Sequence, residues 1–132
     1  MAHSQPKFHV CQNLVYELIG TTPYTLTSYT VPETGMYEII AHACFSSGSE
    51  GAKTVGVMEI LVGTDLILQL KETINGFEAE CMSLVSGACL AEITAGSTIY
   101  QKVYTTKSEY AYIEGTTSQM FIRKLEFGRV ES

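Results

Sequence analysis

The side chains best suited to metal binding or nucleophilic catalysis in this chain are three histidines and four cysteines. His3, His9 and His42 have no second ligand at a spacing that would complete a metal site, and no His-x-His motif occurs. The spacing of Cys81 and Cys89 does not match a zinc knuckle. No local Ser/His or Cys/His signature marks a nucleophile. We therefore expect no bound metal and no cofactor.

Acidic side chains are the other candidates for chemistry, because paired carboxylates can act as general acid and base. Glu59, Glu78, Glu80 and Glu92 supply carboxylates, but nothing in their spacing marks two of them as a pair, and solvated side chains are the expected reading. Together with the absence of a nucleophile motif, this predicts a protein that is not an enzyme.

The composition restricts the class of protein further. The chain has 132 residues, of which 45% are hydrophobic and 17% charged, with a formal net charge of −6. This length and composition predict one globular domain over residues 1–132, with an N-terminal arm at 1–7. An acidic domain is a poor match for a phosphate backbone, so we expect no nucleic-acid partner. No apolar run approaches the ~20 residues that cross a bilayer, so we expect no membrane insertion.

The cysteines bear on the compartment. The N-terminal residues lack the apolar segment of a secretory signal peptide, which favours folding in a reducing cytoplasm. Cys44 and Cys89 lie in apolar stretches, where a free cysteine behaves as a small hydrophobic residue. We expect both to be buried and reduced, with no intrachain disulfide.

Alternating apolar and polar residues predict strands rather than helices along most of the chain. Residues 36–45 alternate with a period of two and are apolar on both faces. Asp65 and the preceding Gly63 form a tight-turn signal between two apolar runs. The further expected strands are residues 8–10, 14–16, 18–19, 25–31, 55–62, 66–70, 98–105 and 120–127.

One stretch is ambiguous, and one is expected to be a loop. Residues 77–93 would also place apolar side chains on one helical face, although Gly87 and the β context favour a strand over 82–93. Residues 106–118 are expected to form a polar loop that carries aromatic side chains. Short strands separated by frequent turn signals predict an all-β antiparallel sandwich.

Three stretches of the sequence together resemble one family. Residues 29–39 (YTVPETGMYEI) are similar to the F-x-V-P-x-x-G-x-Y-x-F segment of complement-globular-head and tumour-necrosis-factor-like domains. Residues 90–99 (LAEITAGSTI) resemble the family's L-x-L-x-A-G-D-x-V segment, with Ser97 in place of the usual Asp. Residues 118–125 lie where the family has its final strand, although Arg123 and Lys124 replace small and apolar residues there.

This resemblance implies a jelly-roll fold, tight homotrimers and action by binding rather than by catalysis. Without a signal segment or a glycosylation sequon, the chain is most similar to bacteriophage or bacterial members. The resemblance to those members therefore implies a virion or surface binding module, such as a fibre tip, a receptor-binding knob or a head decoration. The alternative is a structural domain that only trimerises a particle component, and a secreted ligand-like domain is a more distant one.

The expected partners and location follow from the same resemblance. The partners would be further copies of the chain, other virion or surface proteins, and a host-surface glycan or protein. The expected location is a virion assembled in the host cytoplasm, or alternatively a bacterial cell or spore surface.

Because several strands are apolar on both faces, the chain has more large apolar side chains than a two-sheet sandwich can bury between its inner faces. Several aromatic residues are candidates for this excess. If a contact between copies hid ~150 Å² of one such side chain, the gain would be about 4 kcal/mol before entropy. The expected trimer-interface residues are Tyr37, Tyr100, Tyr104, Phe121 and Phe127.

Tyrosines among small polar residues make good contacts for proteins and sugars. Such residues occur in the expected loop, although the two tyrosines there could instead fold onto the sandwich. The expected partner-binding residues are Lys107, Glu109, Tyr110 and Tyr112.

Overall fold

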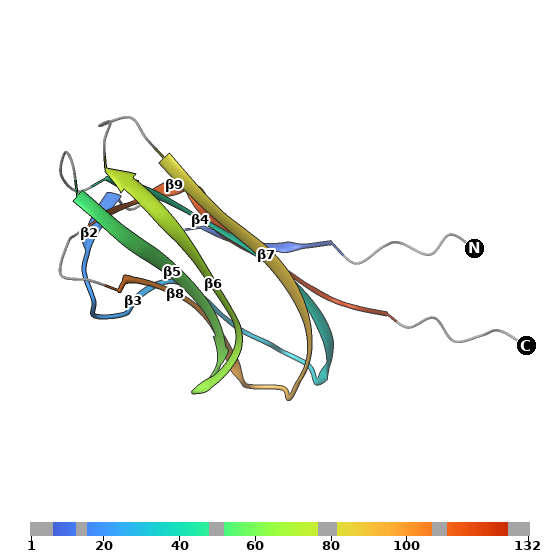
Figure 1. Cartoon of the computed structure of the whole chain (residues 1–132). Coiled ribbons are helices and arrows are strands. Elements are labelled where there is room, and N and C mark those ends of the chain that lie inside the picture. The colour runs from blue at the N-terminus through green and yellow to red at the C-terminus, as the bar shows by residue number, and fades with distance from the viewer. Residues whose placement is uncertain (1–6, 13–15, 48–51, 77–81, 107–110, 127–132) are drawn as a thin grey trace, which may run out of the picture.

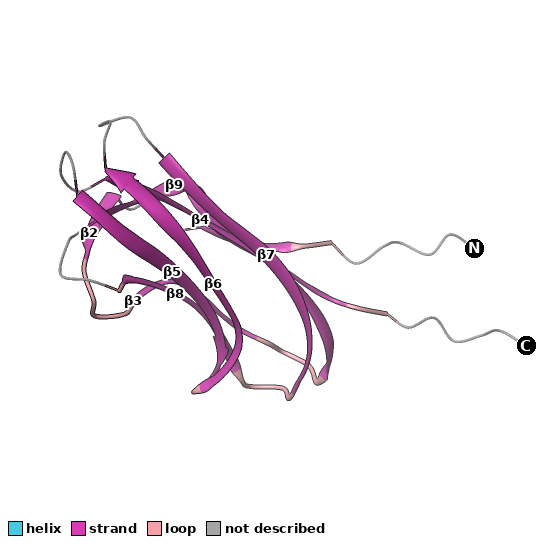
Figure 2. Cartoon of the chain, viewed as in Figure 1, coloured by secondary structure: helices cyan, strands magenta, loops and turns pink. Residues whose placement is uncertain are grey.

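The computed structural model describes residues 7–12, 16–47, 52–76, 82–106 and 111–126. These residues form nine strands (Figure 1) and no helix (Figure 2). In the described part of the chain, no helix is therefore long and apolar enough to cross a membrane. The strands are β1 (His9–Gln12), β2 (Tyr16–Ile19), β3 (Tyr24–Thr30), β4 (Gly35–Ser47), β5 (Ala52–Val62), β6 (Asp65–Gly76), β7 (Met82–Ile93), β8 (Thr98–Thr105) and β9 (Ala111–Lys124).

The strands form two antiparallel sheets that pack face to face (Figure 1). The five-stranded sheet has the order β1-β9-β4-β7, and β2 pairs with the first part of β9 while β1 pairs with its last part. The four-stranded sheet has the order β3-β8-β5-β6. Neighbouring strands within each sheet are mostly distant in sequence, as in a jelly roll.

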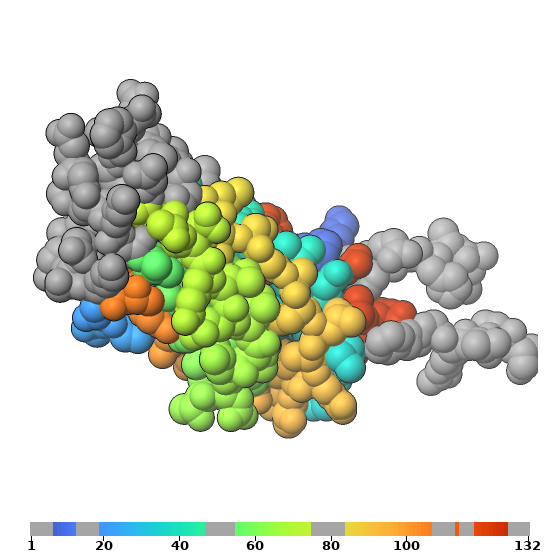
Figure 3. All heavy atoms as spheres, in the orientation of Figure 1, coloured from blue at the N-terminus to red at the C-terminus, as the bar shows by residue number. Residues whose placement is uncertain are grey.

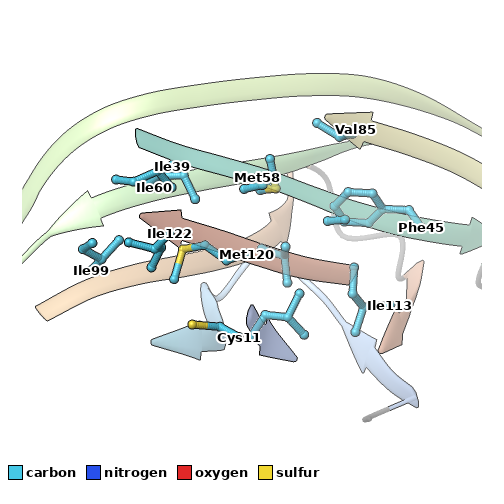
Figure 4. Packing of buried hydrophobic residues seen from close by; sticks show 14 of the residues in the cluster. Cys11, Ile39, Phe45, Met58, Ile60, Val85, Ile99, Ile113, Met120 and Ile122 are labelled. Carbon is cyan, nitrogen blue, oxygen red and sulfur yellow. The ribbon is translucent and has the colours of Figure 1, made fainter. Parts of the chain in front are cut away.

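The core lies between the two sheets and follows from the period-two alternation. On β4 the side chains of Ile39, Ala41 and Phe45 are fully buried. The residue directly before Ile39, the one between Ile39 and Ala41, and the one directly after Ala41 are partly exposed. Figure 4 shows side chains of β4 and β9 packed between the layers against those of β5 and β8. Each fully buried side chain of this size contributes roughly 1.5–3 kcal/mol to folding.

One side of the sandwich is closed by the edge strands β6 and β7. Gly87 on β7 lies directly against Leu70 of β6, and a Cβ at that position would collide with the leucine side chain. Figure 3 shows the atoms of β6 (light green) and β7 (gold) in contact along this side. A residue without a side chain thus lets the edges of the two sheets meet.

A buried glutamine connects the two layers. The Gln101 side chain is fully buried, and its Nε2 donates to the backbone carbonyls of His42 (3.0 Å) and Gln119 (3.3 Å). Its Oε1 accepts a hydrogen bond from the Thr27 hydroxyl at 2.8 Å. The pairing of β4 with β9 shifts register directly after His42, where the Ser118 hydroxyl accepts from the backbone N–H of Cys44 at 2.9 Å. Gln101 therefore satisfies carbonyl groups beside an interruption of the sheet ladder.

The structure confirms most of the expected strands and corrects some boundaries. Residues 82–93 form a strand, as favoured over a helix, and Gly63 adopts the positive φ (+61°) expected in the hairpin turn. The expected loop at 106–118 is wrong over 111–118, because β9 begins at Ala111 and pairs there with both β2 and β4. The polar composition of this segment concealed a strand whose Ile113 is fully buried. Of the expected arm, only Lys7 lies within the described residues.

Candidate functional site

The face of the five-stranded sheet that points away from the other sheet carries an unusual number of apolar side chains. They alternate along the strands with the buried residues, so they are presented outward. We call this surface the apolar face. Its apolar members are Val10 on β1, Ile40 on β4, Leu84, Ala88 and Leu90 on β7, and Phe121 on β9.

Large hydrophobic side chains are exposed mainly on this face. Leu90 is 61% exposed, Leu84 59% and Val10 48%. Among the described residues, the fourth large hydrophobic side chain with comparable exposure is Leu66 (50%), which lies at the start of β6 in the other sheet. Apolar residues that gather on one face of a sheet mark an interaction surface more reliably than scattered ones.

Two oppositely charged residues of the apolar face are paired with each other. Arg123 Nε lies 2.7 Å from Glu38 Oε1, and both side chains are about one-quarter exposed. The Arg123 guanidinium also lies over the Phe8 ring, 4.6 Å from its centroid. The guanidinium is thus held in place by a carboxylate and an aromatic ring. These two residues bring no net charge to the surface.

His42 lies at the middle of the apolar face. Its register partners on the neighbouring strands are Ser86 of β7 and Gln119 of β9, both uncharged. The imidazole packs against Phe121, with the ring centroids 5.6 Å apart. Both register partners of this imidazole are therefore neutral.

The structure separates the residues expected at a trimer interface. Tyr37 is only 3% exposed and donates a hydrogen bond to the Glu33 carbonyl (2.6 Å), so it has almost no surface to offer a second copy. Tyr100 and Tyr104 lie on β8 and alternate with the buried residues of that strand, so they are on the outside of the four-stranded sheet. Phe121 lies on the apolar face, and Phe127 is outside the described residues.

Tyr104 belongs to a hydrogen-bonded group on the outside of the four-stranded sheet. Its hydroxyl donates to Glu59 Oε2 at 3.0 Å, and Gln69 Nε2 donates to the same oxygen at 2.6 Å. Burial, together with the neighbouring Glu59 carboxylate, raises the pKa of Tyr104 above its ordinary value. Lys102 lies over the neighbouring Tyr100 ring, 5.4 Å from its centroid. These polar and charged side chains therefore have interaction partners on the surface of their own sheet.

The residues expected to bind a partner fall mostly outside the described part of the chain. Lys107, Glu109 and Tyr110 are among the residues that the structure does not describe. Tyr112 is in β9, where its backbone is in register with Leu18 of β2 and Ser46 of β4. Their role in binding stays a prediction.

The sequence reasoning missed Leu84 and Leu90 as surface residues. Their signal was present, because both belong to the even-numbered face of residues 82–93, opposite Val85 and Ile93. That face was not distinguished from the buried one because both are apolar.

A groove of about 420 Å³ lies between the edge strands β1 and β3. It contains a histidine and a cysteine, two residue types that can form a nucleophilic pair. It is lined by residues 9–12 and 25–28, which include His9 and Cys11 but no carboxylate. Burial raises the pKa of Cys11 from 9.0 to about 11, opposite to the lowered pKa of an activated thiol. The His9 ring packs on Tyr29 instead, with centroids 4.3 Å apart. This groove lacks the groups for nucleophilic catalysis.

The other candidate chemistry is likewise unsupported within the described residues. No group of three or more His, Cys, Asp or Glu side chains there could hold a metal ion. Cys11, Cys44 and Cys89, the cysteines within the described residues, form no disulfide with one another; Cys44 is buried as expected, whereas Cys89 is only partly buried. Burial also raises the pKa of the Cys89 thiol.

Comparison with solved structures identifies the fold. The chain matches the structure of Eiger TNF from S. frugiperda with a TM-score of 0.63 and 13% identity, over 96% of this chain and 98% of that one. It matches the globular domain of zebrafish complement 1qA protein with a TM-score of 0.57 and 12% identity, over 93% and 98% of the two chains. The chain therefore has a jelly-roll fold like those of tumour necrosis factor and C1q.

A viral structure shares the fold as well. A chain in the structure of infectious bursal disease virus, Gt strain, matches with a TM-score of 0.60 and 12% identity, over 93% of this chain and 33% of that one. No protein-family model and no curated protein sequence matches the chain. At these identities the similarity establishes the fold alone.

Proposed function

We propose that this protein is a non-enzymatic module that acts as a homotrimer, with the apolar face as the surface through which the copies associate. The observation that carries the proposal is the exposure of Leu84, Leu90 and Val10 on one face of the five-stranded sheet. Burial of such side chains contributes about 25 cal/mol per Å² of apolar surface, which favours association of copies over exposure to water. The sequence resemblance to trimeric domains independently supports three copies.

The interface we propose differs in part from the residues first expected there. Phe121 remains, because it lies on the apolar face next to Ile40 in register. Tyr37 has no free surface, and Tyr100 and Tyr104 are on the opposite side of the sandwich. These two tyrosines would remain on the outside of an assembly built through the apolar face.

We propose that the trimer serves a virion or surface particle as a binding module, such as a fibre tip, a receptor-binding knob or a head decoration. The match to a viral chain of similar fold supports this proposal. Other particle proteins and a host-surface glycan or protein are the proposed partners, with no nucleic acid and no membrane insertion. Location on a virion, or on a bacterial cell or spore surface, belongs to the same proposal.

A structural role is the second candidate, in which the trimer only joins particle components. The exposed Leu66 at the start of β6 would then contact a neighbouring particle protein rather than a receptor. Imaging the intact particle by electron microscopy separates the two. A trimer whose outward loops are free supports the binding module, and one with all outward surfaces covered by neighbouring proteins supports the structural role.

Mutation of the apolar face tests the association directly. The double variant Leu84→Glu, Leu90→Glu places two carboxylates on it, and we expect a folded monomer by size-exclusion chromatography with light scattering. The matched control is Leu66→Glu, which adds a carboxylate at a similarly exposed leucine of the other sheet and should remain a trimer. If the double variant assembles like the wild type, the apolar face is not the interface.

A further inference from the structure

Among the described residues, His42 is the one histidine on the apolar face. Histidine is the side chain that ordinarily gains or loses its proton between about pH 5 and 8. His42 lies on β4 between Ile40 and Cys44, and its ring packs on Phe121. Any partner that covers Leu84, Leu90 and Phe121 also approaches this imidazole.

The register partners of His42 offer no charge that would stabilise an imidazolium. On β7 its register partner is Ser86, and on β9 it is Gln119. On β4 the nearest titratable group is the buried thiol of Cys44, and Glu38 lies four residues away, about 13 Å along an extended strand. Glu38 is already paired with Arg123 of β9.

Two further carboxylates belong to the strands packed beside His42. Glu92 lies six residues beyond Ser86 on β7, about 20 Å away along the strand. Glu114 of β9 is in register with Cys44, two residues from His42 on β4. Glu114 is thus the carboxylate whose removal must be tested alongside that of His42.

We propose that His42 makes assembly through the apolar face dependent on pH, so that protonation of its imidazole dissociates the copies. The inference rests on the proposed association through this face. A neutral imidazole can be buried there with Ser86 and Gln119 beside it, whereas a charged one loses its hydration without gaining an oppositely charged register partner. Because the dissociated state then binds more protons than the assembly, association weakens as the pH falls.

The expected effect is large because it is multiplied by the number of copies. Below the pH at which free histidine titrates, each proton taken up on dissociation weakens association up to about tenfold per pH unit. Three copies, each with one His42, would give up to about a thousandfold per pH unit for the trimer. Because the dissociation constant of a trimer varies with the square of the protein concentration, this change raises the concentration at half-dissociation by about thirtyfold per pH unit.

Sedimentation velocity of the full chain at about pH 8 and about pH 5.5 tests the proposal, because aspartate and glutamate remain mostly ionised at both. We expect a trimer at the higher pH and a monomer at the lower one for the wild type. His42→Gln should remain a trimer at both. The matched control is His9→Gln, which changes a histidine on the same sheet that packs on Tyr29 rather than on the apolar face, and it should behave like the wild type. Glu114→Gln should also retain the acid dissociation.

The outcomes distinguish this inference from the function on which it rests. A wild type that stays trimeric at the lower pH overturns the inference and leaves the proposed association intact. A wild type that is monomeric at the higher pH overturns the association itself. Acid dissociation of His42→Gln like that of the wild type, or its loss in Glu114→Gln, would show that another group is the sensor.

If His42→Gln does not assemble at either pH, the wild type still provides a test. Dilution-driven dissociation near pH 6.5 in a titration calorimeter, repeated in buffers of different ionisation enthalpy, gives the number of protons bound. We expect net uptake of at most about 1.5 protons per trimer, because a free histidine is about half protonated at this pH, and no uptake would refute the role of His42.

Discussion

Replacing Gln101 with leucine removes the polar connection between the two sheets while keeping the volume of the side chain. Gln101 is fully buried and joins the Thr27 hydroxyl to the carbonyls of His42 and Gln119. The register shift directly after His42 explains why a side chain rather than a strand supplies these hydrogen bonds. The variant therefore tests whether the interruption in β4–β9 pairing depends on Gln101.

The magnitude follows from the groups that lose a partner. Leaving a buried polar group unsatisfied costs about 1–3 kcal/mol, and two carbonyls and one hydroxyl are affected here. Thr27 is 7% exposed, so its hydroxyl can regain part of its hydration. After the gain from burying leucine, we expect a net loss of about 3 kcal/mol in the free energy of unfolding. The control Thr27→Ala removes one of the hydrogen bonds and should cost about 1 kcal/mol.

Guanidinium unfolding followed by circular dichroism, at one fixed protein concentration for all variants, measures both changes. A Gln101→Leu variant within about 0.5 kcal/mol of the wild type would refute the reasoning, because it would mean that the carbonyls have other partners. A loss in Thr27→Ala equal to that in Gln101→Leu would place the whole effect on the hydroxyl.

The remaining predictions concern a thiol, a turn and a binding segment. Because the pKa of Cys11 is raised to about 11, its alkylation by iodoacetamide at pH 9 should be about fiftyfold slower than in unfolded protein by mass spectrometry, and equal rates would contradict its burial. Gly96→Ala should lower the free energy of unfolding by denaturant by about 1 kcal/mol, because the backbone φ of Gly96 is +88°. A Cβ there would meet no neighbour, so the backbone conformation alone causes the loss. An unchanged free energy of unfolding would show that the turn relaxes. Changing Tyr110 and Tyr112 together to alanine should shift stability by only about 0.5 kcal/mol while reducing attachment of the trimer to its particle or receptor. Loss of stability with unchanged attachment per folded trimer would assign both tyrosines to the core.

The strands and their inward faces were predictable because their signals are local. The alternation in residues 36–45 places Ile39, Ala41 and Phe45 on one face, and these side chains are buried. The turn at Gly63 was equally readable, because a tight turn needs a residue that accepts positive φ. Fold class followed from the accumulation of such signals.

The parts that could not be predicted depend on distant partners. Residues 111–118 are polar enough to resemble a loop, but residues 111–114 pair with β2 on one side and with β4 on the other, which makes them the start of a strand. The position of the candidate interface also depended on topology. Tyr100 and Leu90 both lie in segments where apolar and polar residues alternate. They lie on different sheets only because β8 pairs within the four-stranded sheet and β7 within the five-stranded sheet.

Sedimentation equilibrium of the wild-type chain tests the central claim most directly. Association of three copies through the apolar face predicts a particle of three times 14.5 kDa that persists on dilution to micromolar concentration at about pH 8. A particle of 14.5 kDa under these conditions would contradict that claim.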